Sequence, residues 1–168
     1  MNASPLDGHK ENTMWPFKKT PPSLNEFPCE GSWQLAQGLR EGKPIIVRMN
    51  ASIEEFRGHP ELTYQVGVAI PFKAPDENGL PSAEESAALD QIEDLVFDTL
   101  QVQGRSVVVA VITTGGMREF VLYAVDPEEV KLNHTRLCKA VRTGHEVQLM
   151  IQTDPKWNVF AALRDGAG

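Results

Sequence analysis

Hydrophobic residues take every second position from Tyr64 to Phe72. This period of two is typical of a half-buried β-strand. Residues 33–40 and 44–50 predict an earlier β-hairpin, because a short polar turn containing Gly42 separates them. Between the hairpin and the strand from Tyr64, the polar character of the chain indicates a connecting segment.

The apolar spacing changes to a helical one after Ser82. Ser82 and Glu85 form a Ser-x-x-Glu capping box at the start of this helix, and Gly104 ends it. A second helix is predicted from Asp126-Pro127, an N-cap followed by a first-turn proline, to Gly144.

Three more strands complete the pattern. Residues 105–114 and 117–125 form a hairpin around Gly115-Gly116, since a two-residue turn of this kind needs positive φ angles. The last strand covers residues 145–153 and ends before Asp154-Pro155. The order β-α-β-β-α-β predicts an α+β fold, a ferredoxin-like sandwich to which the N-terminal β-hairpin is added.

The length of 168 residues suits one such domain. Residues 1–31 contain few aliphatic side chains and no periodicity, so we expect a disordered or loosely packed tail. The single α+β domain is then expected over residues 32–163, followed by a flexible C-terminus at 164–168.

The Gly115-Gly116 turn also predicts which residues share a face of the sheet, because paired residues point to the same side. The face expected beneath the helices carries Val107, Val109, Val111, Phe120, Leu122 and Ala124. The second face carries Val108, Ala110, Ile112, Glu119, Val121 and Tyr123. This second face is too apolar to stand in water. The N-terminal hairpin, the chain around Trp157 or a second subunit in a homodimer could cover it.

The formal net charge of −7 argues against nucleic acid or an anionic membrane as the main partner. No stretch is apolar enough to span a membrane, and no signal peptide is evident. Two cysteines and four scattered histidines predict no metal site, and no cofactor motif is found. His134 and Cys138 are interpreted as structural residues of the second helix, with Cys138 buried. These features indicate a cytoplasmic protein.

Acidic residues concentrate on the first predicted helix, which contains no basic residue. Its side chains could form a docking surface for a basic protein partner; the candidate contacts are Glu85, Asp90, Glu93, Asp94, Phe97 and Asp98. Alternatively, these charges could complement the basic residues of the second helix across the seam between the two helices.

A second hypothesis starts from Glu119, a carboxylate expected on a mostly apolar face. Arg48 or Lys156 could simply be its structural partner. A small-molecule-binding or hydrolytic site would instead require several polar side chains to converge in one pocket. The candidates are Arg48, Asn50, Thr114, Arg118, Glu119, Tyr123, Asp154 and Trp157.

Three segments carry a resemblance to a known family. Residues 42–50, 79–81 and 112–123, together with Asp154-Pro155-Lys156-Trp157, resemble the bacterial domain of unknown function 695 family. The most specific part is Thr-Thr-Gly-x-x-Arg-Glu-Phe, and the resemblance covers residues 33–160. The family is uncharacterised, so the resemblance implies a fold and no activity.

That family is similar in turn to the ribonuclease E regulator B family, mainly through the strand Arg-Glu-Phe-Val-Leu-Tyr. Those proteins are acidic and ferredoxin-like, and they inhibit a nuclease by binding it. The likeness implies a regulatory domain that inhibits by binding, and the charge pattern suggests that it would act through the acidic helix. We therefore predict a cytoplasmic, non-enzymatic domain that binds another protein.

Overall fold

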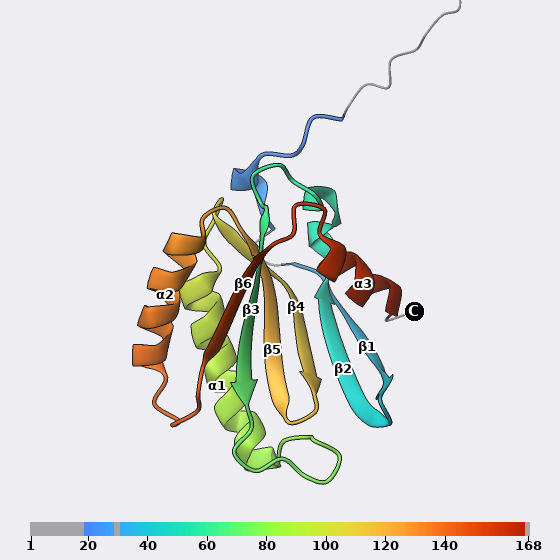
Figure 1. The fold of residues 1–168 in the computed structure, drawn as a ribbon, viewed down its shortest axis with the longest axis vertical. Helices are drawn as coiled ribbons and strands as arrows, with labels where there is room; N and C mark the ends of the chain where they lie inside the picture. The colour runs from blue at the N-terminus through green and yellow to red at the C-terminus, as the bar shows by residue number, and fades with distance from the viewer. Residues whose placement is uncertain (1–18, 29–30, 167–168) are drawn as a thin grey trace, which may run out of the picture.

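The computed structural model of the chain describes residues 19–28 and 31–166 (Figure 1). Six strands form one antiparallel sheet in the order β1-β2-β4-β5-β3-β6. The strands are β1 (Trp33–Arg40), β2 (Lys43–Asn50), β3 (Tyr64–Pro71), β4 (Ser106–Thr114), β5 (Met117–Ala124) and β6 (Gln148–Thr153). The α-helices are α1 (Ala83–Leu100), α2 (Pro127–Ala140) and α3 (Asn158–Gly166), and the short 3-10 helices are η1 (Leu24–Glu26) and η2 (Ala51–Phe56).

The α+β fold class predicted from the sequence is confirmed. The elements β3-α1-β4-β5-α2-β6 follow the expected order, and their strand order is compatible with a ferredoxin-like arrangement. The hairpin β1–β2 is joined to them because β2 pairs with β4. The hairpin therefore widens the sheet and does not fold over its second face.

Helices α1 and α2 lie side by side on one face of the sheet (Figure 1). The Ser82 hydroxyl caps α1 by accepting from the Glu85 amide at 3.1 Å, as the capping box predicts. Apolar residues at helical spacing, such as Leu89, Ile92 and Val96, are then buried against the strands. This stripe places the first hydrophobic core between the helices and the sheet.

The predicted register of the β4–β5 hairpin is confirmed near its turn, where Ile112 pairs with Glu119. Further along, a β-bulge lies between Val108 and Ala110. The bulge inserts one extra residue, so the inward and outward positions exchange beyond it. Val107 and Val109 therefore lie in the second core, and Val108 lies beneath the helices, contrary to the prediction.

The second face of the sheet is covered by three segments from within the chain. Trp157 and Phe160, at and just inside the start of α3, pack against it. Phe56 of η2 joins the same core, and its ring lies 4.9 Å from that of Phe27. Of the covers considered from the sequence, the chain around Trp157 is the one that lies here.

Phe27 falls within the segment expected to be a loosely packed tail, yet it is buried. Its neighbourhood is held by His59, whose Nε2 lies 3.1 Å from the Pro22 carbonyl oxygen. The remainder of that predicted tail, residues 1–18 and 29–30, lies outside the described residues.

Helix α2 ends at Ala140, four residues before the predicted Gly144, and β6 starts at Gln148. The linker between them bonds to distant parts of the chain: the Lys73 ammonium donates to the Thr143 carbonyl. Helix α3 was not expected from the sequence, and it lies within the region predicted as packed chain and flexible C-terminus. Among the described residues, no helix is long and apolar enough to cross a membrane.

Candidate functional site

The acidic residues of α1 divide into an exposed set and an engaged set. Asp94 and Asp98 are exposed, and Phe97 is half-buried with its ring 5.9 Å from that of Trp33 on β1. Asp90 is exposed as well, although its carboxylate lies 3.0 Å from Arg118 Nη1. These residues form one surface on the side of α1 that extends toward β1.

Glu93 is the centre of an ion-pair network. Its two carboxylate oxygens accept from Nη1 and Nη2 of Arg48 at 2.8 and 2.6 Å, and one of them also lies 3.2 Å from Arg118 Nη1. Such a bidentate guanidinium–carboxylate pair fixes α1 to strands β2 and β5. Among the described residues, no ion pair joins α1 to α2, so the charges do not complement each other across the helix seam.

Glu85 is buried and cannot belong to an exposed docking surface, contrary to the prediction. Its carboxylate accepts from the backbone amides of Lys73 at 2.5 Å and Ala74 at 3.3 Å, and lies 3.0 Å from His145 Nε2. Burial alone would raise the pKa of Glu85, but these hydrogen bonds outweigh it and hold the pKa below its ordinary value. Glu85 thus fastens two loops to the start of α1.

Replacing Glu85 with Gln should lower the free energy of unfolding by about 1.5–3 kcal/mol at neutral pH, because a buried charged acceptor is lost. Because the pKa of Glu85 is lower in the folded state than in the unfolded state, the carboxylate stabilises the fold at pH values above its unfolded-state pKa. This stabilisation is lost as the pH falls through the folded-state pKa. The difference between wild type and E85Q should therefore shrink below pH 4.5, the ordinary value. Urea unfolding across pH 3–8 measures it, with the exposed Glu84→Gln as control. A difference that stays constant over this range would contradict the prediction.

The eight polar residues of the second hypothesis do not converge in one pocket. Arg48 and Arg118 lie on the helix side of the sheet with Glu93, whereas Glu119 points to the second face. Asn50 is buried, where its side-chain oxygen accepts from the Ser52 amide and caps η2. The candidates do not converge because side chains alternate along a strand, so that neighbours such as Arg118 and Glu119 point to opposite faces of the sheet.

Tyr123, Asp154 and Trp157 form a closed structural cluster that anchors α3. The Tyr123 hydroxyl donates to Asp154 Oδ2 at 2.7 Å, and the indole of Trp157 stacks on the Tyr123 ring at 4.0 Å. Burial raises the pKa of Tyr123, and the Asp154 carboxylate raises it further. Burial opposes ionisation of Asp154, but bonds from the Val159 amide, Tyr123 and Asn158 hold its pKa below the ordinary value. All three side chains are buried, so they offer no surface to a substrate.

Glu119 lies in a groove of about 710 Å³ on the second face, beside α3. A smaller hollow of about 350 Å³ adjoins it and includes Thr114, whose hydroxyl donates to the Pro44 carbonyl at 2.9 Å. Of the eight candidates, only Glu119 and Thr114 line these openings.

Sequence reasoning missed the other residues of the groove, notably Arg40 and Gly38 on β1 and Leu163 on α3. The alternation within the hairpin could have placed Gly38 and Arg40 on one face. Val159 and Leu163, four residues apart, were the available sign of a helix with an apolar side.

Strand β1 forms an edge of the sheet and exposes large apolar side chains. Leu35 is 62% exposed and Leu39 is 75% exposed, and both lie on the same side of the hairpin as Trp33. This side faces α1, as the contact between Trp33 and Phe97 shows. Edge strands are usually protected against pairing with another strand, but β1 exposes leucines and lacks this protection.

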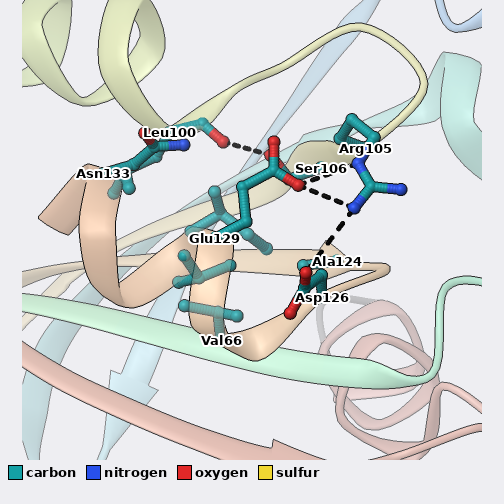
Figure 2. Close-up of a pocket in the computed structure, with 10 residues that line it drawn as sticks. Val66, Leu100, Arg105, Ser106, Ala124, Asp126, Glu129 and Asn133 are labelled. Atoms are coloured by element: carbon teal, nitrogen blue, oxygen red, sulfur yellow. Dashed lines mark hydrogen bonds and ion pairs between the residues drawn. The ribbon is translucent and has the colours of Figure 1, made fainter.

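A small cavity of about 10 Å³ lies where α1 ends and where β4 and α2 begin (Figure 2). Arg105 closes it, with Nε and Nη2 both 2.8 Å from Glu129 Oε2 and Nη2 3.8 Å from Asp126 Oδ2. A space of this volume holds about one water molecule. The cluster therefore joins the first turn of α2 to β4 and provides no ligand site.

His134 is satisfied structurally, as predicted, because its Nε2 lies 2.9 Å from the Val147 carbonyl oxygen. The prediction that Cys138 is buried is wrong. Leu137 takes the buried position on α2, and the next residue is turned away from the core. Within residues 19–28 and 31–166, no cluster of three His, Cys, Asp or Glu could hold a metal ion.

These features define an α+β domain whose six-stranded antiparallel sheet has two helices on one face and a groove beside a third helix on the other. The chain belongs to the Family of unknown function (DUF695), whose sequence profile matches residues 31–163. This match confirms the family resemblance inferred from the sequence, but it carries no support for the further likeness to ribonuclease E regulator B proteins. No curated protein matches the sequence.

Proposed function

We propose that this domain binds a protein partner, accepting an extended basic segment along β1 beside the acidic surface of α1. The observation that carries the proposal is the open edge of β1. Within the described part of the chain, β1 pairs with β2 alone, so the backbone groups on its outer side have no strand partner. An exposed sheet edge of this kind binds extended peptides by adding them as a further strand.

The apolar side chains on β1 support the same interpretation. Leu35 and Leu39 would lie beside alternate side chains of an added strand, because residues two apart share a face. Natural proteins usually protect free edges with charges or prolines, and β1 carries neither over Trp33–Leu39.

Charge indicates the chemistry of the partner. Leu35 pairs with Arg48, whose guanidinium group is bound by Glu93 of α1, so the acidic helix flanks this side of the hairpin. Asp90 and Glu93 on α1 pair with the guanidinium groups of Arg48 and Arg118, whereas Asp94 and Asp98 are exposed and form no ion pair among the described residues. The remaining negative charge favours a segment that contains Lys or Arg.

Selection from a random peptide library on the purified full chain tests the proposal. We expect enriched peptides with basic residues interspersed among apolar ones. The Asp94→Lys/Asp98→Lys double variant should weaken their binding at least about tenfold, because exposed charges steer and orient a basic ligand. Glu93 is left intact in this variant because its ion pairs hold α1 to the sheet.

The matched control is Glu61→Lys/Glu77→Lys, which changes the net charge equally at exposed positions outside α1. It should bind the peptides like wild type. A second variant, Leu35→Lys/Leu39→Lys, should abolish binding while leaving the circular dichroism spectrum unchanged, since both leucines are exposed. Peptides without basic enrichment, or equal binding to the Asp94/Asp98 variant, would overturn the proposal.

A further inference from the structure

The space on the second face is an open groove with an apolar floor. Its volume of about 710 Å³ lies within the range of sites that hold small organic ligands. Strands β2, β4 and β5 supply the floor, and α3 supplies one wall with Val159 and Leu163. The floor side chains are Ile45, Val47, Ile112 and Val121.

Glu119 and Arg40 lie where the groove joins the smaller hollow, because both line the two spaces. Arg40 is exposed, whereas Glu119 is half-buried over the apolar floor. No Glu119–Arg40 ion pair within 4.0 Å is formed. The floor of the groove is apolar, and Glu119 and Arg40 together give the groove a polar end.

Glu119 has no hydrogen-bond or ion-pair partner among the residues that the structure describes. Its position contrasts with that of Glu93, which binds two arginines, and of Glu85, which accepts from two amides. A half-buried carboxylate without a partner is costly, since burial removes part of its hydration. Burial accordingly raises the pKa of Glu119, and the charge of Arg40 acts in the opposite direction.

The neighbouring strand makes room for this carboxylate. A Cβ atom on Gly67 would lie only 3.2 Å from Glu119 Oε1, a tight contact that any larger residue would impose. Gln65 on the same strand accepts from Gln152 through its Oε1, and its Nε2, 3.9 Å from that Cβ position, forms no hydrogen bond with Glu119. Gly67 thus leaves space for the Glu119 carboxylate at the β3 side of the groove.

We propose that the groove binds a small amphipathic organic cation, with its ammonium group at Glu119 and its apolar body on the floor. An ammonium group supplies the donors and the charge that the lone carboxylate lacks. The net charge of −7 favours such a ligand, and the exposed Arg40 side chain can remain in solvent. The groove lies on the face of the sheet opposite α1, so the Asp94→Lys/Asp98→Lys variant tests the peptide surface without changing a residue of the groove.

The test is a titration of the full chain with n-hexylammonium chloride. Binding is monitored through the methyl NMR signals of Ile45, Val47, Ile112 and Val121. We expect saturable shifts of these signals. n-Hexanol should bind at least about tenfold more weakly, because it lacks the charge that pairs with the carboxylate. Glu119→Gln should reduce hexylammonium binding to the level of hexanol, and the exposed Glu77→Gln should leave it unchanged.

Gly38→Phe provides a second variant that blocks the groove without removing a charge. Gly38 pairs with Ile45 and so points into the groove, and a Cβ there would lie 3.9 Å from the nearest atom, Ile45 Cγ2. The phenyl ring should abolish the methyl shifts. The proposal is overturned if hexylammonium binds no better than hexanol or if Glu119→Gln binds it like wild type. It is also overturned if the ligand-free methyl signals depend on protein concentration, because a second copy then fills the groove.

Discussion

Trp157→Ala is expected to lower the free energy of unfolding by about 3–5 kcal/mol, the cost of truncating a fully buried large aromatic residue. The Trp157 side chain is 0% exposed and lies between the rings of Tyr123 and Phe160. Its Nε1 also donates to the Leu62 carbonyl at 2.9 Å. The substitution therefore removes ring packing and leaves a buried carbonyl without its donor.

Trp157 also has a backbone role. Its φ angle of +58° lies in the left-handed region, which a tryptophan adopts only when its surroundings hold it there. The turn it makes leads directly into α3, whose first amides bond to Asp154. Loss of the side chain should thus loosen α3 as well as the core.

Urea unfolding followed by far-ultraviolet circular dichroism measures this effect without relying on tryptophan fluorescence. Trp33→Ala is the matched control, because Trp33 lies on the edge strand and its ring is partly exposed beside that of Phe97. It should cost clearly less than Trp157→Ala, because Trp33 is 36% exposed and the substitution removes less buried packing. Equal losses in the two variants would contradict the anchoring role of Trp157.

Glu93→Ala is expected to cost about 3 kcal/mol, because it leaves two guanidinium groups beside the helix without their shared carboxylate. The Arg118 side chain is only 11% exposed, and its Nε is buried without a partner already. Arg48 is 38% exposed and can turn toward solvent, so the effect falls at the lower end for a buried ion pair. Alanine favours a helix, so the loss cannot come from helix propensity.

Asp90→Ala is the control for the Glu93 substitution. Both carboxylates bind Nη1 of Arg118, but the Asp90 side chain is 73% exposed and that of Glu93 is 16% exposed. A solvent-exposed ion pair contributes about 0–1 kcal/mol, so this variant should stay close to wild type. Urea unfolding of both variants at low and high salt provides the measurement. A Glu93 effect as small as that of Asp90 would mean that the network does not hold α1 to the sheet.

Local patterns predicted most of the fold. The capping box at Ser82 and the Gly115-Gly116 turn identified the start of α1 and the register of the β4–β5 hairpin. The predicted faces of β4 were wrong for the residues before Ala110, because the extra residue of a β-bulge exchanges the two faces. The bulge leaves no clear sign in the sequence, since it lies in a run of valines. The short helix α3 was missed although Val159 and Leu163 had helical spacing.

The candidate site was harder to predict, because it depends on which strands are neighbours. Arg118 and Glu119 are consecutive on one strand, so their opposite directions could have been read from the alternation. To predict that Arg48 and Glu119 lie on opposite faces of the sheet, one would need to know that β2 pairs with β4 and that α1 covers the face of Arg48. The acidic residues were predicted to act as one surface, yet Glu85 is buried and bonds to His145, sixty residues away.

The sequence by itself determined the order along the chain of the six strands and of helices α1 and α2, the start of these two helices and the family, because these follow from local periodicity, turn residues and motifs. Only the tertiary structure decided which charged residues hold the fold together and which remain available. Glu93 and Glu85 are engaged by groups from distant strands and loops, whereas Glu119 meets an apolar groove built by α3 and the β1–β2 hairpin. The physical reason is that partnering and burial depend on contacts between segments far apart in the chain, which no local pattern encodes.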